Sequence, residues 1–207
     1  MPPPVKRAEA AARTRARIRE AAAALFVSRG YVVTTMRDIA RAAEVGERTV
    51  YAAFPGKAEL FRHVLDVATA GDEEPVAVAD RPEIRTGDLP TVLGYTADLF
   101  ERAGDLIMVT VQAADADPDM RAAADAGARA TRAVWLTLTQ SLHDAGELRA
   151  GLSAQEAADI LYALASPHTH QLLRRHCRWT PQRYRTWLTE TATQQLLRRG
   201  GGDDLLG

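Results

Sequence analysis

Apolar residues recur three and four positions apart along most of this 207-residue chain, which is the spacing of amphipathic helices. One such stripe, Leu60, Phe61, Val64 and Leu65, predicts a helix over residues 57–70. Residues 71–90 combine glycine, prolines and acids and are expected to form a loop. No segment alternates apolar and polar residues as a strand does, so the predicted fold class is all-α. Further helices are predicted over residues 91–103, 105–116, 118–144, 153–175 with a kink at Pro167, and 181–199.

The segment that begins at Thr35 is interpreted as two short helices around a tight turn. Asp38 follows Thr35 by three residues, and the pair forms a capping box that begins the first helix. Gly46 can cap the second helix, and Val45 and Val50 around it have the spacing of a hydrophobic staple. A staple fixes the angle at which the chain enters a helix, which a DNA-recognition helix requires. A plain packing corner of two helices has the same pattern.

The second short helix presents polar side chains outward. Val50 and Phe54 lie four residues apart and are expected to turn inward. Arg48 could then bond O6 and N7 of a guanine, and the hydroxyl groups of Thr49 and Tyr51 could donate to phosphate oxygens. The first contact would specify sequence, and the others would position the protein.

Lys57 lies in the first turn of the next helix, directly after Pro55 and Gly56. Backbone N–H groups, the helix dipole and the ammonium group all favour a phosphate there. Taken singly, each polar residue of this region is equally compatible with a solvated surface, and only the joint placement favours DNA binding. The predicted DNA-binding residues are Thr35, Arg37, Gly46, Glu47, Arg48, Thr49, Tyr51 and Lys57.

Charge is unevenly distributed along the chain, although the net charge is only −1. Residues 1–63 contain 12 Lys or Arg against 6 Asp or Glu, a net +6, and residues 64–207 contain 14 against 21, a net −7. This asymmetry fits a basic DNA-binding end joined to a regulatory body. Prolines at positions 2–4 predict a flexible basic arm, or alternatively an inert tail. Some basic residues near this end are expected to contact DNA, from Lys6, Arg7, Arg13, Arg15, Arg17 and Arg19.

Residues 43–61, Ala-Glu-Val-Gly-Glu-Arg-Thr-Val-Tyr-Ala-Ala-Phe-Pro-Gly-Lys-Ala-Glu-Leu-Phe, resemble the signature of the TetR/AcrR family of transcriptional regulators. The likeness extends to the preceding helix, residues 18–31, and to Thr34-Thr35. It implies an all-α homodimer with an N-terminal three-helix helix-turn-helix domain and a larger C-terminal domain for ligand binding and dimerisation. Most members of the family are repressors. The expected domains are residues 12–72 for DNA binding and 73–199 for regulation and dimerisation.

Three positions depart from the family pattern. Glu44 occupies a turn position where the family often has glycine, and a positive φ there would cost about 1 kcal/mol or more. Gly46 replaces a serine N-cap at small cost. Glu47 would repel phosphates unless it accepts a hydrogen bond from a cytosine N4, and we favour that specificity role. Because Ala52 and Ala53 follow further along the helix, base reading is expected to depend on Arg48, Glu47 and Thr49.

The last two predicted helices are similar to those that dimerise many TetR-like regulators as a four-helix bundle. The candidate interface residues, which could instead be core positions of one chain, are Ile160, Leu164, Tyr184, Trp187 and Leu188. A small-molecule pocket is expected among the middle helices, although aromatic and Met residues at helical spacing are usually core. The candidate pocket residues are Tyr95, Phe100, Met108, Gln112, Trp135 and His143.

The single cysteine, Cys177, excludes an intramolecular disulfide and favours a reducing cytoplasm. Cys177 also lies close to His168, His170 and His176 in the sequence, but the spacing is not that of a zinc site. We interpret this stretch as a helix end with surface histidines. Neither a metal nor a cofactor is expected.

No membrane span is expected, because the longest apolar run, residues 21–27, is far too short. Asp117 and Asp119 are interpreted as solvated loop acids rather than a catalytic pair.

The leading hypothesis is a ligand-responsive regulator that binds a near-palindromic DNA operator as a homodimer and is not an enzyme. The alternative is a small helical enzyme or carrier with a vestigial N-terminal module, although no phosphate loop, metal constellation or catalytic triad supports it.

Overall fold

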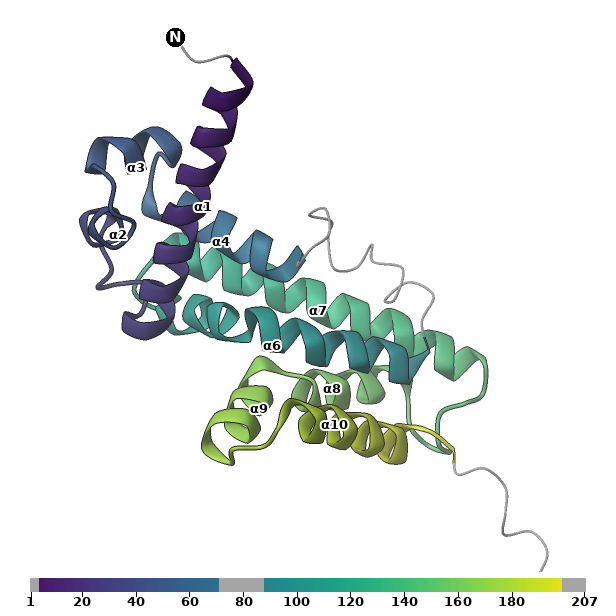
Figure 1. Cartoon of the computed structure of the whole chain (residues 1–207). Coiled ribbons are helices and arrows are strands. Elements are labelled where there is room, and N and C mark those ends of the chain that lie inside the picture. Colours follow the sequence, from purple (N-terminus) through teal and green to yellow (C-terminus); the bar gives the residue numbers. More distant parts are fainter. Residues whose placement is uncertain (1–3, 71–87, 199–207) are drawn as a thin grey trace, which may run out of the picture. The chain divides into compact units, whose positions relative to one another are not determined.

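The computed structural model describes residues 4–70 and 88–198, and these ranges contain helices, turns and one isolated bridge between Leu148 and Leu197 (Figure 1). The first four helices are α1 (Pro4–Arg29), α2 (Met36–Ala42), α3 (Glu47–Ala53) and α4 (Lys57–Ala70). The later elements are α6 (Leu89–Ala113), α7 (Pro118–Asp144), α8 (Ala154–Leu164), α9 (Pro167–Gln171), the π-helical turn η2 (Leu172–His176) and α10 (Pro181–Leu196). The predicted all-α fold class is confirmed.

The chain forms two compact units. The N-terminal unit comprises Met1–Pro75 and Asp105–Ala124, and the C-terminal unit comprises Val76–Gly104 and Asp125–Gly207. The N-terminal unit therefore includes the end of α6 and the start of α7, which the sequence division had placed in the regulatory domain. The predicted boundary between residues 72 and 73 lies outside the described residues.

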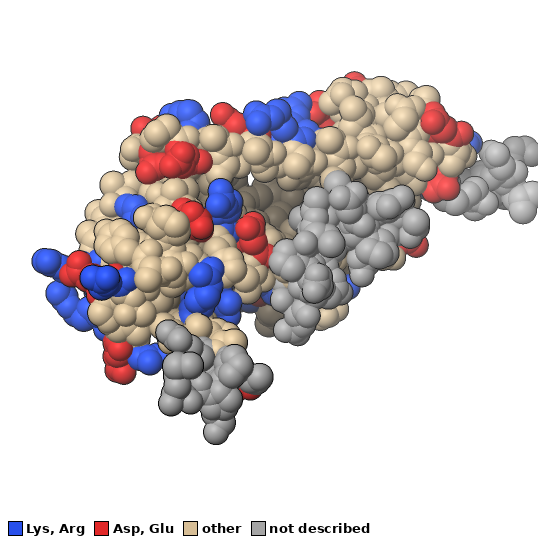
Figure 2. Space-filling view, turned by 90° about the horizontal axis from the view of Figure 1, so that it is seen from above, with Lys and Arg blue, Asp and Glu red and all other residues tan. Residues whose placement is uncertain are grey.

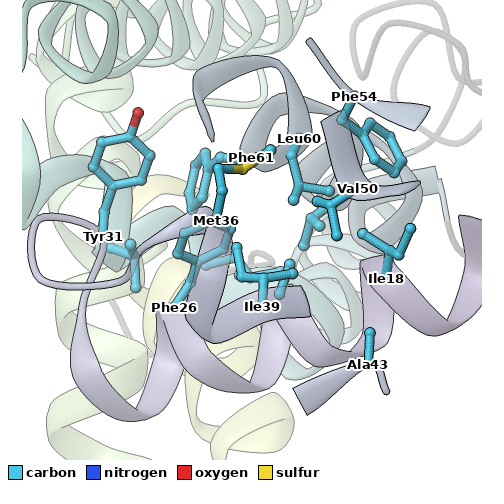
Figure 3. Close-up of a cluster of buried hydrophobic side chains, with 14 of the residues drawn as sticks. Ile18, Phe26, Tyr31, Met36, Ile39, Ala43, Val50, Phe54, Leu60 and Phe61 are labelled. Atoms are coloured by element: carbon cyan, nitrogen blue, oxygen red, sulfur yellow. The ribbon is translucent and has the colours of Figure 1, made fainter. Parts of the chain in front are cut away.

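The core of the N-terminal unit joins α1–α4 to apolar side chains of residues 105–124. Phe26, Tyr31 and Phe61 form an aromatic cluster whose ring centroids lie 5.1–5.6 Å apart (Figure 3). Ile39 of α2 and Val50 of α3 are fully buried in the same core. Burial of each such side chain stabilises the fold by about 1.5–3 kcal/mol. α2 and α3 are therefore held in place by the hydrophobic core of the N-terminal unit.

The turn between α2 and α3 has the predicted caps. The Thr35 hydroxyl accepts a hydrogen bond from the Asp38 N–H at 3.1 Å, and the Asp38 carboxylate accepts one from the Thr35 N–H at 3.2 Å. Gly46 is the N-cap of α3 and makes no side-chain bond. Glu44 has a φ of 52°, in the left-handed region. The predicted capping box and short helices are confirmed.

Replacement of Glu44 by glycine is expected to raise the free energy of unfolding by about 0.5 kcal/mol. The left-handed conformation costs a non-glycine residue about 1–2 kcal/mol, and the additional chain entropy of glycine offsets about half of this gain. Urea denaturation of Glu44→Gly measures the effect. The matched control is Glu59→Gly in the first turn of α4, where glycine should instead destabilise the protein by up to about 1 kcal/mol.

Two helix starts differ from the sequence prediction for one reason. α1 begins at Pro4, and α6 begins at Leu89 with Pro90 in its first turn, although both prolines had been assigned to irregular structure. The first turn of a helix needs no backbone donor from its residues, so proline is tolerated there. Residues 1–3 of the predicted arm and residues 71–87 of the predicted loop lie outside the described residues.

The prediction of separate helices over residues 91–103 and 105–116 was wrong, because α6 is continuous through Gly104. A Cβ at this position would lie 3.3 Å from Nδ1 of His170, so the glycine allows close packing rather than ending the helix. Asp117 was also misinterpreted as a solvated acid. Its carboxylate accepts hydrogen bonds from the N–H groups of Asp119 and Met120 at 3.0 and 3.1 Å, and so it caps α7.

The predicted helix over residues 118–144 is confirmed as α7, which lies in the C-terminal unit from Asp125 onward. α8 follows the predicted capping box of Ser153 and Glu156. The predicted kink at Pro167 is a complete break, after which α9 and η2 follow. α10 ends at Leu196, and residues 199–207 lie outside the described residues. The core of this unit packs α6, α7, α8 and α10 together, with Leu93, Trp135, Leu161, Tyr184 and Leu188 among its buried side chains.

Candidate DNA-binding site

The outward face of α3 carries the side chains available to an external partner. Val50 and Phe54, which are 0% and 1% exposed, hold the helix and its C-cap against the core. Arg48, Thr49 and Tyr51 are exposed. Within the described part of the chain, these three side chains have no hydrogen-bond partner. The structure thus places the predicted guanidinium and two hydroxyl groups on one helix, which Val50 and Phe54 hold against the core.

Glu47 and Arg37 form an ion pair between α2 and the first turn of α3. Nε of Arg37 lies 2.7 Å from Oε1 of Glu47, and both side chains remain largely exposed. The hydrogen bond to Glu47 raises the pKa of Arg37 above its ordinary value. The sequence interpretation treated Glu47 as an isolated carboxylate. Its pairing with a cation counters the expected repulsion of phosphates and couples its orientation to that of Arg37.

Lys57 is held inside the N-terminal unit. Its ammonium group donates to the carbonyl oxygens of Tyr31 and Val32 at 2.9 and 3.3 Å, and it lies 4.2 Å from the centroid of the Tyr31 ring. Burial lowers the pKa of Lys57, and nearby Asp117 opposes this shift. The ammonium group therefore joins the α1–α2 loop to the start of α4, a contact that no local sequence pattern indicates. One N–H of the ammonium group is left for the predicted phosphate contact.

Thr35 and Gly46 also have local roles. The Thr35 hydroxyl is engaged with Asp38, to whose carboxylate it donates at 2.5 Å. Gly46 offers a backbone N–H at the start of α3, near the hydroxyl of Thr49. Both residues are exposed. They remain candidates for contacts to the DNA backbone.

Two arginines of α1 contact the C-terminal ends of the short helices. Arg15 donates to the carbonyl oxygen of Ala53 at 2.6 Å, and Arg17 donates to that of Ala43 at 2.6 Å. From the sequence, these arginines were predicted only as contacts to DNA. Their capping function depends on side-chain distances between helices that the sequence pattern does not contain.

Lys and Arg side chains gather at the left of the view in Figure 2, over the N-terminal unit, with acids interspersed. The N-terminal unit thus has the basic surface that the charge count predicts for residues 1–63. Some of these charges are already bonded within the unit, as for Arg15, Arg17, Arg37 and Lys57. The basic surface therefore provides both internal contacts and attraction for phosphates.

His63 is expected to make the stability of the N-terminal unit pH-dependent. Burial, and then the charges of Arg15 and Arg19, lower the pKa of His63 below its ordinary value of 6.5. The unfolded chain therefore binds the proton more tightly, and stability should fall as the pH drops below about 6.5 until the lowered folded-state pKa is passed. Melting temperatures at pH 7.5 and 5 should differ less in His63→Gln than in the wild type. His168→Gln, on an exposed residue, is the control, and an equal pH effect in His63→Gln would contradict this expectation.

The interpretation of His170 as a surface histidine was wrong. His170 is 8% exposed, and its Nε2 lies 2.8 Å from Oε1 of Glu101. Arg174 bonds both oxygens of that carboxylate, at 2.5 and 2.9 Å, and lowers the pKa of Glu101. His168, His176 and Cys177 are exposed. Among the described residues, no group of three or more potential metal ligands occurs.

The candidate pocket residues occupy different environments. Phe100, Met108 and Trp135 are buried, Tyr95 is half-buried, and Gln112 and His143 are exposed. Met108 and Gln112 belong to the N-terminal unit, whereas the other four belong to the C-terminal unit. The Tyr95 hydroxyl and the Trp135 indole N–H are buried without a hydrogen-bond partner among the described residues. These two groups are the strongest of the six candidates for a polar contact to a ligand.

The candidate dimer residues divide into two groups. Tyr184 and Leu188 are completely buried in the core of the single chain, so they cannot present surface to a second copy. This corrects their assignment as interface residues. Ile160, Leu164 and Trp187 pack against the same core but are only half-buried. Surface on α8 and α10 therefore remains available for an interface.

α3 packs against the core, exposes a guanidinium and two hydroxyl groups, and follows the short helix α2 after a tight turn. This arrangement defines the class of the protein, a helix-turn-helix DNA-binding protein. Residues 18–64 match the family model described as bacterial regulatory proteins, tetR family. This match places the DNA-binding domain of that family in the N-terminal part of the chain. No curated protein matches the chain significantly.

Solved structures share the fold over nearly the whole chain. NalD of Pseudomonas aeruginosa, described as the secondary repressor of the MexAB-OprM multidrug efflux pump, has 22% identity and a TM-score of 0.71, covering 92% of this chain and 100% of its own. A regulator of Saccharomonospora viridis in complex with choline has 22% identity and a TM-score of 0.67, covering 91% and 100%. The SmeT–triclosan complex has 18% identity and a TM-score of 0.66, covering 90% and 93%. At this level of identity, the likeness establishes the fold alone.

Within the described ranges, no helix combines the length and apolarity that crossing a membrane requires.

Proposed function

We propose that this protein is a ligand-responsive transcriptional repressor that binds a near-palindromic DNA operator as a homodimer and is released by a small molecule. The observation that carries the proposal is the outward face of α3, where Arg48, Thr49 and Tyr51 are exposed while Val50 fixes the helix in the core. Arg48 reads guanine, and the two hydroxyl groups bond phosphates. The Arg37–Glu47 pair lies beside them and contributes to specificity.

Homodimerisation is supported by the half-buried Ile160, Leu164 and Trp187 on α8 and α10. A twofold dimer presents two copies of α3 to two half-sites, so the operator should be nearly palindromic with its half-sites about one helical turn or a multiple apart.

The proposed effector is a small organic molecule bound in the C-terminal unit. Two proteins of the same fold were solved with such molecules, triclosan in SmeT and choline in the S. viridis regulator. In this chain, Tyr95 and Trp135 offer buried, unpartnered hydrogen-bonding groups beside apolar side chains. An effector acts as an inducer only if it binds the DNA-free arrangement more tightly than the DNA-bound one. No enzymatic step is part of this proposal.

The proposed location is the cytoplasm, where the operator would be reached. The single cysteine, Cys177, is exposed and free, as suits a protein of a reducing compartment.

The proposal is tested by selecting duplexes from a randomised library with the wild-type protein. We expect one enriched, near-palindromic sequence, bound by a dimer in sedimentation or mass photometry. Addition of aromatic and quaternary-ammonium compounds, with triclosan and choline among them, then identifies molecules that weaken the complex. Enrichment of no sequence would overturn the proposal, and a monomeric complex would overturn its symmetry.

A further inference from the structure

We propose that Arg15 and Arg17 of α1 are positioning residues for DNA recognition, which fix α3 and α2 by capping their C-terminal ends. This inference rests on the proposed function, because it concerns how α3 is held toward an operator. It assigns to α1 a part in sequence discrimination that does not require contact with a base.

The two guanidinium groups reach different helices. Arg15 donates to the carbonyl oxygen of Ala53, the last residue of α3, and Arg17 donates to that of Ala43, the C-cap of α2, each at 2.6 Å. Residues two positions apart in a helix point about 200° away from each other. One helix can therefore hold both partners, one from each side.

Among the described residues, neither carbonyl group accepts a hydrogen bond from a backbone N–H beyond its helix. The last carbonyl oxygens of a helix lack an intrahelical partner and carry the negative end of the helix dipole. After Ala53 the chain becomes extended at Phe54 and continues with Pro55, which has no N–H. After Ala43 the N–H groups of Glu44 and Val45 bond to Arg41 and Ala40 instead. A positive side chain supplies the missing donor and complements the dipole at both ends.

Each arginine makes a second contact that fixes its orientation. The guanidinium carbon of Arg15 lies 4.4 Å from the centroid of the Phe54 ring, the residue that anchors the end of α3. Arg17 lies within 3.4 Å of the carbonyl oxygen of Glu44 and 3.5 Å of its carboxylate. Glu44 is the residue with the left-handed backbone in the turn. Arg17 thus stabilises the segment that sets the angle between α2 and α3.

A phosphate contact and a positioning contact have different signatures. Loss of one phosphate contact lowers the affinity for every DNA sequence alike and reduces the slope of log K against log salt by about 0.9. Loss of positioning misplaces Arg48 relative to its base, which lowers the affinity for the operator but not for unrelated DNA. The ratio of the two affinities is a readout that a general loss of folded protein does not change.

The experiment compares wild type, Arg15→Met, Arg17→Met and the control Arg13→Met, an exposed α1 residue. Affinities are measured from 50 to 300 mM salt for the duplex that the wild type selects and for a scrambled duplex of equal length. We expect Arg15→Met and Arg17→Met to bind the selected duplex at least tenfold more weakly, with scrambled-duplex affinity within twofold and the salt slope unchanged. Arg13→Met should retain the affinity ratio.

Arg15→Lys keeps the charge, and it tests the inference even if Arg15→Met does not fold. It should retain the salt slope and lose part of the discrimination, since one ammonium group cannot reproduce the planar fork. The inference is overturned if Arg15→Lys discriminates like the wild type, or if the Met variants lose equal affinity for both duplexes. A wild-type protein that selects no sequence would overturn the proposed function, and this inference with it. Selection followed by undiminished discrimination in the variants would overturn the inference alone.

Discussion

Arg48→Ala is expected to weaken binding to the selected operator by about 5- to 150-fold, because a bidentate contact to guanine contributes about 1–3 kcal/mol of discrimination. The side chain is exposed on α3 and has no hydrogen-bond partner among the described residues, so its removal should leave the melting temperature unchanged. Fluorescence anisotropy with operators substituted one base pair at a time measures the effect. Specificity should relax at one base pair of each half-site.

The matched control is Arg62→Ala, which removes an exposed arginine from α4. It should leave base preference unchanged. Arg48 would lose its assignment as the base-reading residue if Arg48→Ala weakened binding to all sequences equally, since that result describes a phosphate contact.

Phe61→Ala should lower the free energy of unfolding by about 3–5 kcal/mol. Phe61 is 1% exposed, and its ring meets those of Phe26 and Tyr31 edge-on at 5.1 and 5.5 Å. Truncation removes one of the three rings of this cluster and leaves a cavity in the core that α1–α4 share (Figure 3). Because a domain is stable by only about 5–15 kcal/mol, DNA binding should also be lost near body temperature. Urea denaturation followed by circular dichroism measures the change.

Val33→Ala provides the comparison for the loss of apolar side-chain atoms from the same unit. Val33 is 65% exposed, so its truncation should change stability by no more than about 0.5 kcal/mol. Comparable effects of the two substitutions would show that the aromatic cluster does not dominate the stability of this unit.

The sequence predicted those parts of the fold that local signals determine. The capping box at Thr35, the staple around Gly46 and the apolar stripe of α4 are spacing patterns within a few residues, and each corresponds to an observed element. Gly104 was misassigned as a helix end because its function depends on His170, which is distant in the sequence. Burial of His170 could not be predicted either, since its partner Glu101 lies on another helix.

For the candidate site, the sequence predicted the exposed residues better than their partners. Exposure of Arg48 and Tyr51 follows from the inward spacing of Val50 and Phe54. The contacts of Lys57 with backbone carbonyl oxygens and of Glu47 with Arg37 depend on how the helices pack, which no local pattern specifies. The capping function of Asp117 could have been predicted from the sequence, because aspartate followed by proline is typical of an N-cap and a first helical position.

The Arg37–Glu47 ion pair gives the recognition surface two alternative hydrogen-bonding states. In the free protein Nε of Arg37 bonds Oε1 of Glu47, so the charges of these two side chains are paired with each other. An operator with a cytosine in reach of Glu47 and a phosphate in reach of Arg37 can replace both partners at once, whereas a sequence that offers only one leaves a charge without its counterpart. Two adjacent positions of the operator would then be recognised jointly, and the energetic effects of changing them would not add.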